Sequence, residues 1–348
     1  MNKMDIHNRE CLRLLDSGEG SGPWNMAVDE VLFLSLRERL AVNSPSIDTS
    51  LPKATIFNNN TETLHSNRHS CDNSTVCSCS DNTSRQGTGG WLRFYRWAPP
   101  TLSFGYFQRP ERSIALEMLN EAGICLVRRS SGGKMVFHAD ELTFSMGLPI
   151  KIISDKKAPF IDLFRKMMQP LVYGLSDLGL EAAFATLESG SESVRRHGTD
   201  RLHCYAAPAG HSVMLAGKKL IGAAGNLREG VLSIHGSIPI WPSQPPIDVF
   251  FNPEEAKCDV ETAFLGKFIS VSRIPELIHA VATRFAEAFN LTLTIRGCLT
   301  PAEKMAAELL ACERYSDVFW PKKSDREQHE IKVRAILRED VDCVANNV

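Results

Sequence analysis

The spacing of apolar and polar positions changes several times along this chain, and each change predicts an element. Large apolar residues recur every three or four positions, as in helices, over 23–34, 111–122, 158–179 and 273–289. Alternation or short apolar runs predict strands at 92–97, 101–107, 213–215, 219–221 and 231–238. We expect Asn25 to cap the first helix and Pro170 to kink or interrupt the helix over 158–179.

Between the first helix and the next strand, the amino-acid composition of the sequence is different. Residues 43–90 are rich in Asn, Ser, Thr and Gly and contain few large apolar side chains. Such a segment cannot bury enough surface to offset its ordering entropy, so we expect a disordered insertion. Its cysteines, Cys71, Cys77 and Cys79, do not have the spacing of a zinc site.

The C-terminal third is predicted to be helical. Thr300-Pro-Ala-Glu303 is a capping box with proline at the first helical position, and it starts a helix through Leu309. Strands accompanied by helices and followed by terminal helices predict an α+β fold with a small helical appendage. We expect a main domain over 1–245, a helical extension over 246–322, and a peripheral or frayed polar tail over 323–348.

Composition narrows the class of protein. The 348 residues are 43% apolar and 23% charged, with a net charge of −2. This charge gives no general attraction to nucleic acid or anionic membranes. We find no apolar signal segment at the start and no apolar run long enough to span a bilayer. The ten scattered cysteines are therefore expected to be reduced thiols in a cytoplasmic protein.

Two stretches carry candidate chemistry. The first, RRSSGGKMVFHADELTFS over 128–145, combines two arginines, small residues and a histidine between apolar runs. Glycines allow a backbone to approach a ligand closely, and guanidinium groups suit phosphate or carboxylate. A structural hairpin with a glycine bulge explains this stretch equally well.

The second stretch places Cys204 fifteen residues before Lys219. Cys204 has small neighbours, and a nearby cation would increase its thiolate fraction. His203, His211 and Lys219 are the local candidates for that cation. The alternatives are that Cys204 is an inert filler and that Lys219 is a solvated charge beside a turn.

Taken in order, these stretches resemble the lipoate–protein ligase and lipoyl/octanoyl transferase family, whose catalytic domain is related to biotin–protein ligases. The segments GPWNMAVDE, LRFYRWAPPTLSFGYFQ, RRSSGGKMVFHADELTFS, CYAAPAGHSVMLAGKKLIGAA and VLSIHGSI carry the resemblance across most of 21–240. It implies a mixed or antiparallel sheet flanked by helices. Lys134, Ala139, Ala223 and Leu227 stand where the family commonly has other residues.

The resemblance also implies residue roles. Cys204 would be the nucleophile, and Lys219 would contact the acyl carbonyl. The wall of an elongated acyl pocket would include the following residues: Arg128, Arg129, Ser130, Ser131, Gly132, Gly133, His138, Gly222 and Ala223. HADELTFS is more similar to the cysteine-dependent octanoyltransferase branch than to the ligases.

The activity implied by this branch is protein lipoylation without a bound cofactor or metal. An octanoyl or lipoyl group would pass from an acyl carrier protein, through Cys204, to a lysine of a lipoyl domain. Acceptors would be lipoyl domains of dehydrogenase complexes or the glycine cleavage H protein. The alternatives are a lipoate ligase using ATP and Mg²⁺, an amidotransferase acting between lipoyl domains, and a degenerate acyl-binding protein without activity.

Overall fold

The computed structural model describes residues 10–42, 89–108, 114, 116–186, 211–244, 246–250, 261–295, 298–317 and 323–345. Its centre is an eight-stranded sheet in the order β11-β1-β2-β6-β10-β9-β8-β7. The strands are β1 (Cys11–Gly20), β2 (Gly90–Trp97), β6 (Glu141–Pro149), β7 (Ala182–Phe184), β8 (Val213–Leu215), β9 (Lys218–Arg228), β10 (Val231–Pro239) and β11 (Thr292–Ile295). β1 runs parallel to β2 and β11, and the other pairs are antiparallel. The predicted α+β class with a mixed sheet is confirmed.

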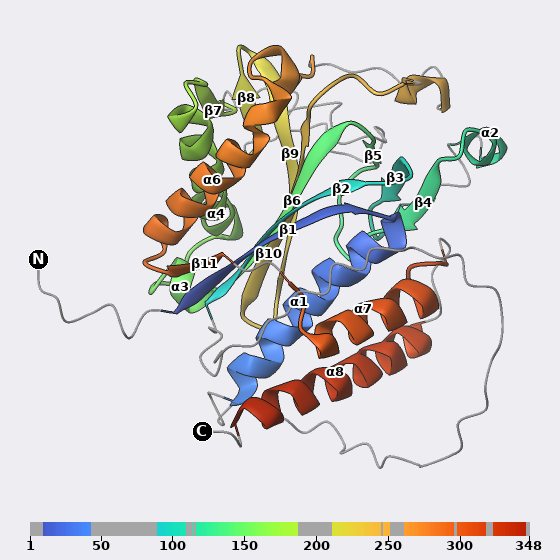
Figure 1. The fold of residues 1–348 in the computed structure, drawn as a ribbon, viewed down its shortest axis with the longest axis vertical. Helices are drawn as coiled ribbons and strands as arrows, with labels where there is room; N and C mark the ends of the chain where they lie inside the picture. The colour runs from blue at the N-terminus through green and yellow to red at the C-terminus, as the bar shows by residue number, and fades with distance from the viewer. Residues whose placement is uncertain are drawn as a thin grey trace, which may run out of the picture.

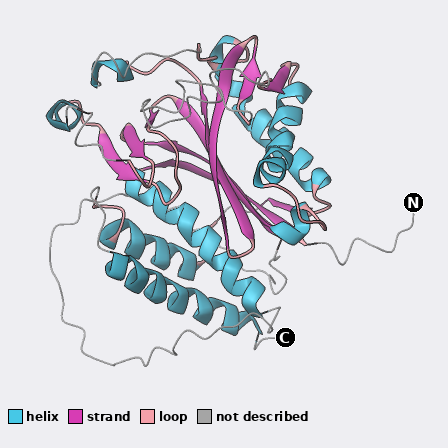
Figure 2. Cartoon of the chain, turned by 180° about the vertical axis from the view of Figure 1, so that it is seen from behind, coloured by secondary structure: helices cyan, strands magenta, loops and turns pink. Residues whose placement is uncertain are grey.

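Helices cover both faces of this sheet (Figures 1 and 2). One face carries α1 (Gly22–Val42), α7 (Pro301–Glu313) and α8 (Lys323–Ala345), and the other carries α3 (Ile150–Ile153), α4 (Phe160–Asp177) and α6 (Ile274–Ala288). Short 3-10 helices occupy Ile247–Phe250, Leu265–Lys267 and Val271–Arg273. Every residue of the central strand β6 is buried, as expected for a strand covered on both faces.

A second, three-stranded sheet lies beside the large one. Its order is β4-β3-β5, built from β3 (Thr101–Phe104), β4 (Cys125–Arg128) and β5 (Val136–His138), with the short helix α2 (Leu116–Glu121). Leu102, Phe104 and Met135 are fully buried in its own small core. Because β4 and β5 flank residues 129–135, this sheet fixes both ends of that loop.

The start of α1 differs from the sequence prediction. The helix begins at Gly22, so the expectation that Asn25 caps it is wrong. The Asn25 side chain instead donates to the carbonyls of Gly20 and Arg96, both at 3.0 Å, and accepts from Arg93 Nη2 at 2.8 Å. It therefore ties the start of α1 to β1 and β2.

Two helices packed on the opposite face show how tertiary contacts override a local signal. α4 runs unbroken through Pro170, so the expected interruption is wrong. The predicted apolar stripe of α6 is buried against α4, and a side chain at Gly174 would collide with Val281 of α6. Burial of Pro170 and the close packing at Gly174 favour the continuous helix despite the hydrogen bond that proline removes.

The predicted hairpin between β8 and β9 is confirmed. Ala216 has φ of 49° and Gly217 has φ of 74°. Positive φ at both central residues is the conformation of a type I′ turn, whose twist matches that of the flanking strands. The hairpin determines the position of Lys219 at the start of β9.

The C-terminal segments are part of the same layered structure. β11 pairs with β1 at the sheet edge, and α7 has the predicted capping box of Thr300 and Glu303. Residues 323–345 form α8, so of the two expectations for this tail the frayed one is wrong, and the peripheral one stays a prediction. Val333 and Leu337 are buried, and Arg334 pairs with Glu38 at 2.7 Å. The domain division at residue 245 stays a prediction, and 43–88 of the expected insertion lie outside the described residues.

A buried ionic cluster fastens α7 to the rest of the protein. Glu303 is completely buried and accepts from Arg13 Nη1 at 2.7 Å, Ser35 Oγ at 2.7 Å and Arg39 Nη2 at 3.2 Å. Burial acts to raise the pKa of Glu303, but Arg13 and Arg39 outweigh it and lower the pKa to about 2. The carboxylate therefore stays ionised inside the fold and joins β1, α1 and α7.

We expect Glu303→Gln to lower the free energy of unfolding by about 3 kcal/mol, because it leaves buried guanidinium charge uncompensated. A lowered carboxyl pKa stabilises the fold fully above its ordinary value of 4.5. That contribution is lost as pH falls toward about 2, so the difference between wild type and variant narrows over this range. Urea titrations of both proteins at several pH values measure this difference in the free energy of unfolding. Glu276→Gln, which removes an exposed pair with Arg273, is the control and should have no measurable effect.

Candidate functional site

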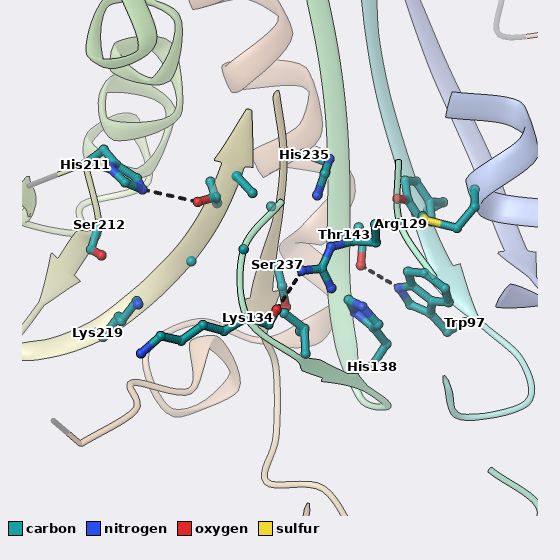
Figure 3. A pocket seen from close by; sticks show the side chains of 18 residues that line it. Trp97, Arg129, Lys134, His138, Thr143, His211, Ser212, Lys219, His235 and Ser237 are labelled. Carbon is teal, nitrogen blue, oxygen red and sulfur yellow. Dashed lines mark hydrogen bonds between the residues drawn. The ribbon is translucent and has the colours of Figure 1, made fainter. Parts of the chain in front are cut away.

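A cavity of about 260 Å³ lies between the α1-side face of the large sheet and the loop 129–135 (Figure 3). Its lining residues are Met26, Tyr95, Trp97, Arg129, Gly133, Lys134, Val136, His138, Thr143, His211, Ser212, Lys219, Gly222, Ala223, Ala224, His235, Gly236 and Ser237. No aspartate or glutamate is among these described lining residues. The cavity combines apolar and small side chains with basic groups.

The floor of the cavity is made by alternate residues of neighbouring strands. Tyr95 and Trp97 come from β2, Thr143 from β6, and His235 and Ser237 from β10. Residues two apart on a strand point to the same face. The strand register therefore brings together side chains that are far apart in the sequence.

The two arginines after β4 hold the covering loop in place. Arg128 Nη1 donates to the carbonyls of Gly105, Tyr106 and Gln108, the last at 2.6 Å. Arg129 donates to the carbonyl and hydroxyl of Ser103, and to the carbonyl of Lys134 at 2.6 Å. The guanidinium groups thus connect the loop to its surroundings, and only that of Arg129 also lines the cavity.

The glycine pair in the loop divides into two different positions. Gly133 has φ of 103°, which side-chain-bearing residues rarely adopt, and it lines the cavity. The Gly133 carbonyl oxygen also lies close to Gly105. A Cβ added to Gly105 would be 1.9 Å from this oxygen. A Cβ at Gly132 would meet no atom within 4 Å. Only Gly133 is therefore required by backbone geometry.

A hydrogen-bond network lies beneath one wall. His138 Nδ1 donates to Glu141 Oε1 at 2.6 Å, and His138 Nε2 is 2.6 Å from Ser103 Oγ. Thr143 and Ser237 also donate to the Glu141 carboxylate. The Trp97 ring stacks on His138 with ring centroids 4.0 Å apart. These contacts fix the orientation of the wall.

Charge at this wall is set by burial and by neighbouring groups. Burial acts to raise the pKa of Glu141, but His138 and the hydrogen bonds from His138, Ser237 and Thr143 lower it below the ordinary value. Desolvation, with Arg129 and His138 nearby, lowers the pKa of His235 to about 3. Glu141 is therefore an anion and His235 is neutral at physiological pH.

The hairpin turn separates the roles of its two lysines. Lys219 is 3% exposed and lines the cavity, whereas the side chain of Lys218 points to solvent and pairs with Glu261 at 2.5 Å. The backbone of Lys219 is fixed as well, since its N–H donates to Glu261 and its carbonyl accepts from Ala263, both at 2.9 Å. Figure 3 shows Lys219 and Trp97 at opposite sides of the cavity.

The predicted site residues are only partly gathered here. Six of them line the cavity: Arg129, Gly133, His138, Lys219, Gly222 and Ala223. Ser130 and Ser131 line a smaller adjacent pocket, while Arg128 and Gly132 belong to the loop but line neither pocket. Cys204 and His203 lie outside the described residues.

Several lining residues were not identified from the sequence. Four of them lie within predicted strands or apolar runs: Trp97, Thr143, His235 and Ser237. Glu141 accepts hydrogen bonds from the side chains of His138, Thr143 and Ser237. A signal for them exists, because Glu141, Thr143 and Ser145 alternate along β6, as do Ser233, His235 and Ser237 along β10. Polar residues in alternate positions of a buried strand indicate a lined cavity.

The fold and the site define an α+β domain with a cavity beside a buried lysine. Residues 76–283 match the family model of the lipoyl protein ligase A/B catalytic domain, and the chain belongs to this family. The octanoyltransferase LipM of Symbiobacterium thermophilum is 32% identical over 88% of this chain and 97% of its own. That of Halalkalibacterium halodurans is 31% identical over 66% and 86%, respectively.

Solved structures agree with this fold. A lipoate-protein ligase A bound with ATP has a TM-score of 0.59 and 22% identity, covering 90% of this chain and 98% of that chain. The protein Ta0514 from T. acidophilum, a lipoate protein ligase homologue with bound lipoic acid, has a TM-score of 0.57 and 22% identity, covering 89% and 97%.

Among the described residues, no three His, Cys, Asp or Glu side chains are grouped as metal ligands. Within the same ranges, no helix has both the length and the apolar composition needed to cross a bilayer.

Gly133→Ala should lower the free energy of unfolding by about 1–2 kcal/mol and weaken the binding of an acyl ligand, because a Cβ strains the backbone at its positive φ. Gly132→Ala is the matched control, with the same added methyl group in open space. Urea denaturation and calorimetric titration with octanamide measure both effects. Equal effects of the two substitutions would contradict the geometry.

Proposed function

We propose that this protein acts in protein lipoylation as an acyltransferase. It takes an octanoyl group from an acyl carrier protein thioester, holds it on Cys204, and passes it to a lysine of a lipoyl domain. The observation that carries the proposal is the cavity in which small and apolar residues lead to the buried Lys219. The similarity to relatives named octanoyltransferase LipM supports the same reaction.

The cavity suits a hydrocarbon chain. Gly222, Ala223 and Gly236 have small side chains or none, which leaves room along β9 and β10. Met26 and Trp97 contribute large apolar surfaces. Each methylene transferred from water to such an environment contributes about 0.8 kcal/mol. An eight-carbon chain therefore gains enough free energy to bind without a charged group of its own.

Lys219 is suited to the transfer step. Its ammonium group is buried at the cavity, and its backbone is fixed on both sides by residues 261–263. A fixed cation beside a thioester carbonyl stabilises the oxyanion that forms when a nucleophile adds. We therefore assign Lys219 to carbonyl activation.

The segment from Cys204 to His211 is long enough for Cys204 to come close to Lys219. Cys204 precedes His211 by seven residues, and His211 and Ser212 line the cavity. Seven residues extend at most about 25 Å. Ser212 is in turn held by Ala185, whose N–H donates to its carbonyl at 2.8 Å. Both described ends of the segment that contains Cys204 therefore lie beside the cavity.

The proposed reaction balances without ATP. The Cys204 thiolate adds to the donor thioester, the carrier thiolate leaves and takes up a proton, and an acyl-cysteine remains. The neutral amine of the acceptor lysine then adds to this thioester, releases the Cys204 thiolate and loses a proton to form the amide. Thioester cleavage supplies the driving force for amide formation.

Incubation with octanoyl carrier protein alone should add one octanoyl group to the protein, observed by intact mass, and Cys204→Ala should abolish the addition. Free octanoate or lipoate with ATP, and an octanoylated lipoyl domain, serve as alternative donors. A product that requires ATP and does not require Cys204 would instead identify a ligase. Acylation from the lipoyl domain alone would identify an amidotransferase.

Lys219→Met should lower kcat for acyl transfer by about 10²–10³, because it removes the cation beside the developing oxyanion. Lys218→Met is the matched control and should retain kcat, since its side chain points away from the cavity. Single-turnover acylation by the octanoyl carrier protein measures both rates. Comparable losses in the two variants would contradict the role of Lys219.

A further inference from the structure

We propose that Glu141 is a positioning residue that makes the acyl cavity selective for saturated chains over chains that carry a hydroxyl group. This inference deepens the proposed function and rests on it. Glu141 does not line the cavity, yet its carboxylate holds the side chains of the wall that faces Lys219.

Four lining side chains depend on this carboxylate. His138, Thr143 and Ser237 donate to it directly. Trp97 Nε1 donates at 2.7 Å to Thr143 Oγ1, whose own hydrogen is directed to Glu141. All five residues are buried, with exposed fractions of 5% or less.

The direction of these hydrogen bonds determines what the wall offers a ligand. An ionised carboxylate can only accept, so each neighbouring hydroxyl or ring N–H must turn its hydrogen toward Glu141. The hydrogens of Thr143, Ser237 and Trp97 are thereby used, and the second ring nitrogen of His138 is engaged by Ser103. The hydroxyl and indole hydrogens of this wall are therefore not offered to a ligand, although the wall is built largely from polar residues.

An oxygen on the ligand chain would lose its hydration and find no donor at this wall. Burial of a hydroxyl group without a partner is unfavourable, so an oxygenated chain is rejected. A saturated chain loses no hydrogen bond when it enters. Selectivity for a fully reduced acyl group thus follows from the charge of a residue that the ligand never touches.

The experiment compares two uncharged probes, octanamide and 8-hydroxyoctanamide, by calorimetric titration. The wild type should bind octanamide at least about tenfold more tightly than 8-hydroxyoctanamide. In Glu141→Gln, the side-chain amide brings its own donor toward the surrounding donors, and at least one of their hydrogens is released toward the cavity. The preference should fall to less than about threefold.

Glu303→Gln is the matched control, because Glu303 is also a buried carboxylate with a lowered pKa and several donors, but it belongs to the α7 cluster. It should lower stability and leave the probe preference unchanged. Thr143→Val, which deprives the Trp97 N–H of its acceptor, should reduce the preference even if Glu141→Gln does not fold. In the double variant, the two effects should not add, since both substitutions act through one network.

Equal weakening of both probes in Glu141→Gln and Thr143→Val would overturn the proposal and leave Glu141 with a structural role only. A wild type that does not distinguish the probes would overturn it as well. The probes contain no thioester and do not require Cys204, so their binding is independent of acyl transfer. Failure of the transfer assay together with the expected probe preference would reject the proposed reaction, and the reverse result would reject only the role of Glu141.

Discussion

A chain of hydrogen bonds from Arg129 through Ser103 and His138 to Glu141 joins the small sheet to the large one along one wall of the cavity. Each member comes from a different element: the loop after β4, then β3, β5 and β6. The chain begins at the buried guanidinium of Arg129 and ends at the buried carboxylate of Glu141, so it links two opposite charges inside the fold. A second contact, between Ser131 Oγ and His235 Nε2 at 3.1 Å, joins the covering loop to β10 of the large sheet.

The helical layer behind the cavity is held by ionic contacts of the same kind. Asp29 on α1 accepts from Arg93 and Tyr95 of β2 and from Ser145 of β6, and Glu30 accepts from Arg314 at the end of α7. Acidic residues that look suited to the first turn of a helix therefore connect α1 to its neighbours. They place Met26, at the start of the same helix, against the cavity.

The proposed chemistry needs an apolar space for the acyl chain and a charged group at one end of it. The strands supply both, because successive side chains along a strand point to opposite faces of the sheet. Adjacent residues Lys218 and Lys219 point to opposite sides of β9, so one pairs with Glu261 at the surface and the other reaches the ligand space. Along β6, the same alternation sends Glu141 and Thr143 toward the cavity side and Leu142 and Phe144 into the opposite core. Sequence neighbours thus perform unrelated tasks.

The sequence by itself determined the local elements whose signals are chemical and short-range. The capping box at Thr300, the turn at Ala216-Gly217, the apolar stripe of α6 and the family motifs all lead to elements that the structure contains. These features depend on residues a few positions apart, where backbone geometry and hydrogen bonding decide the outcome.

Only the tertiary structure decided which polar residues form the site and which helices persist. Asn25 ties strands together instead of capping, and Pro170 stays within a helix. The polar residues 323–345 form a helix because Arg334 pairs with Glu38 of α1 and with Glu229 in the turn after β9. Glu141 and Ser237 meet across paired strands although they are far apart in the chain. Such contacts depend on sheet register and long-range burial, which the pattern of one segment does not contain.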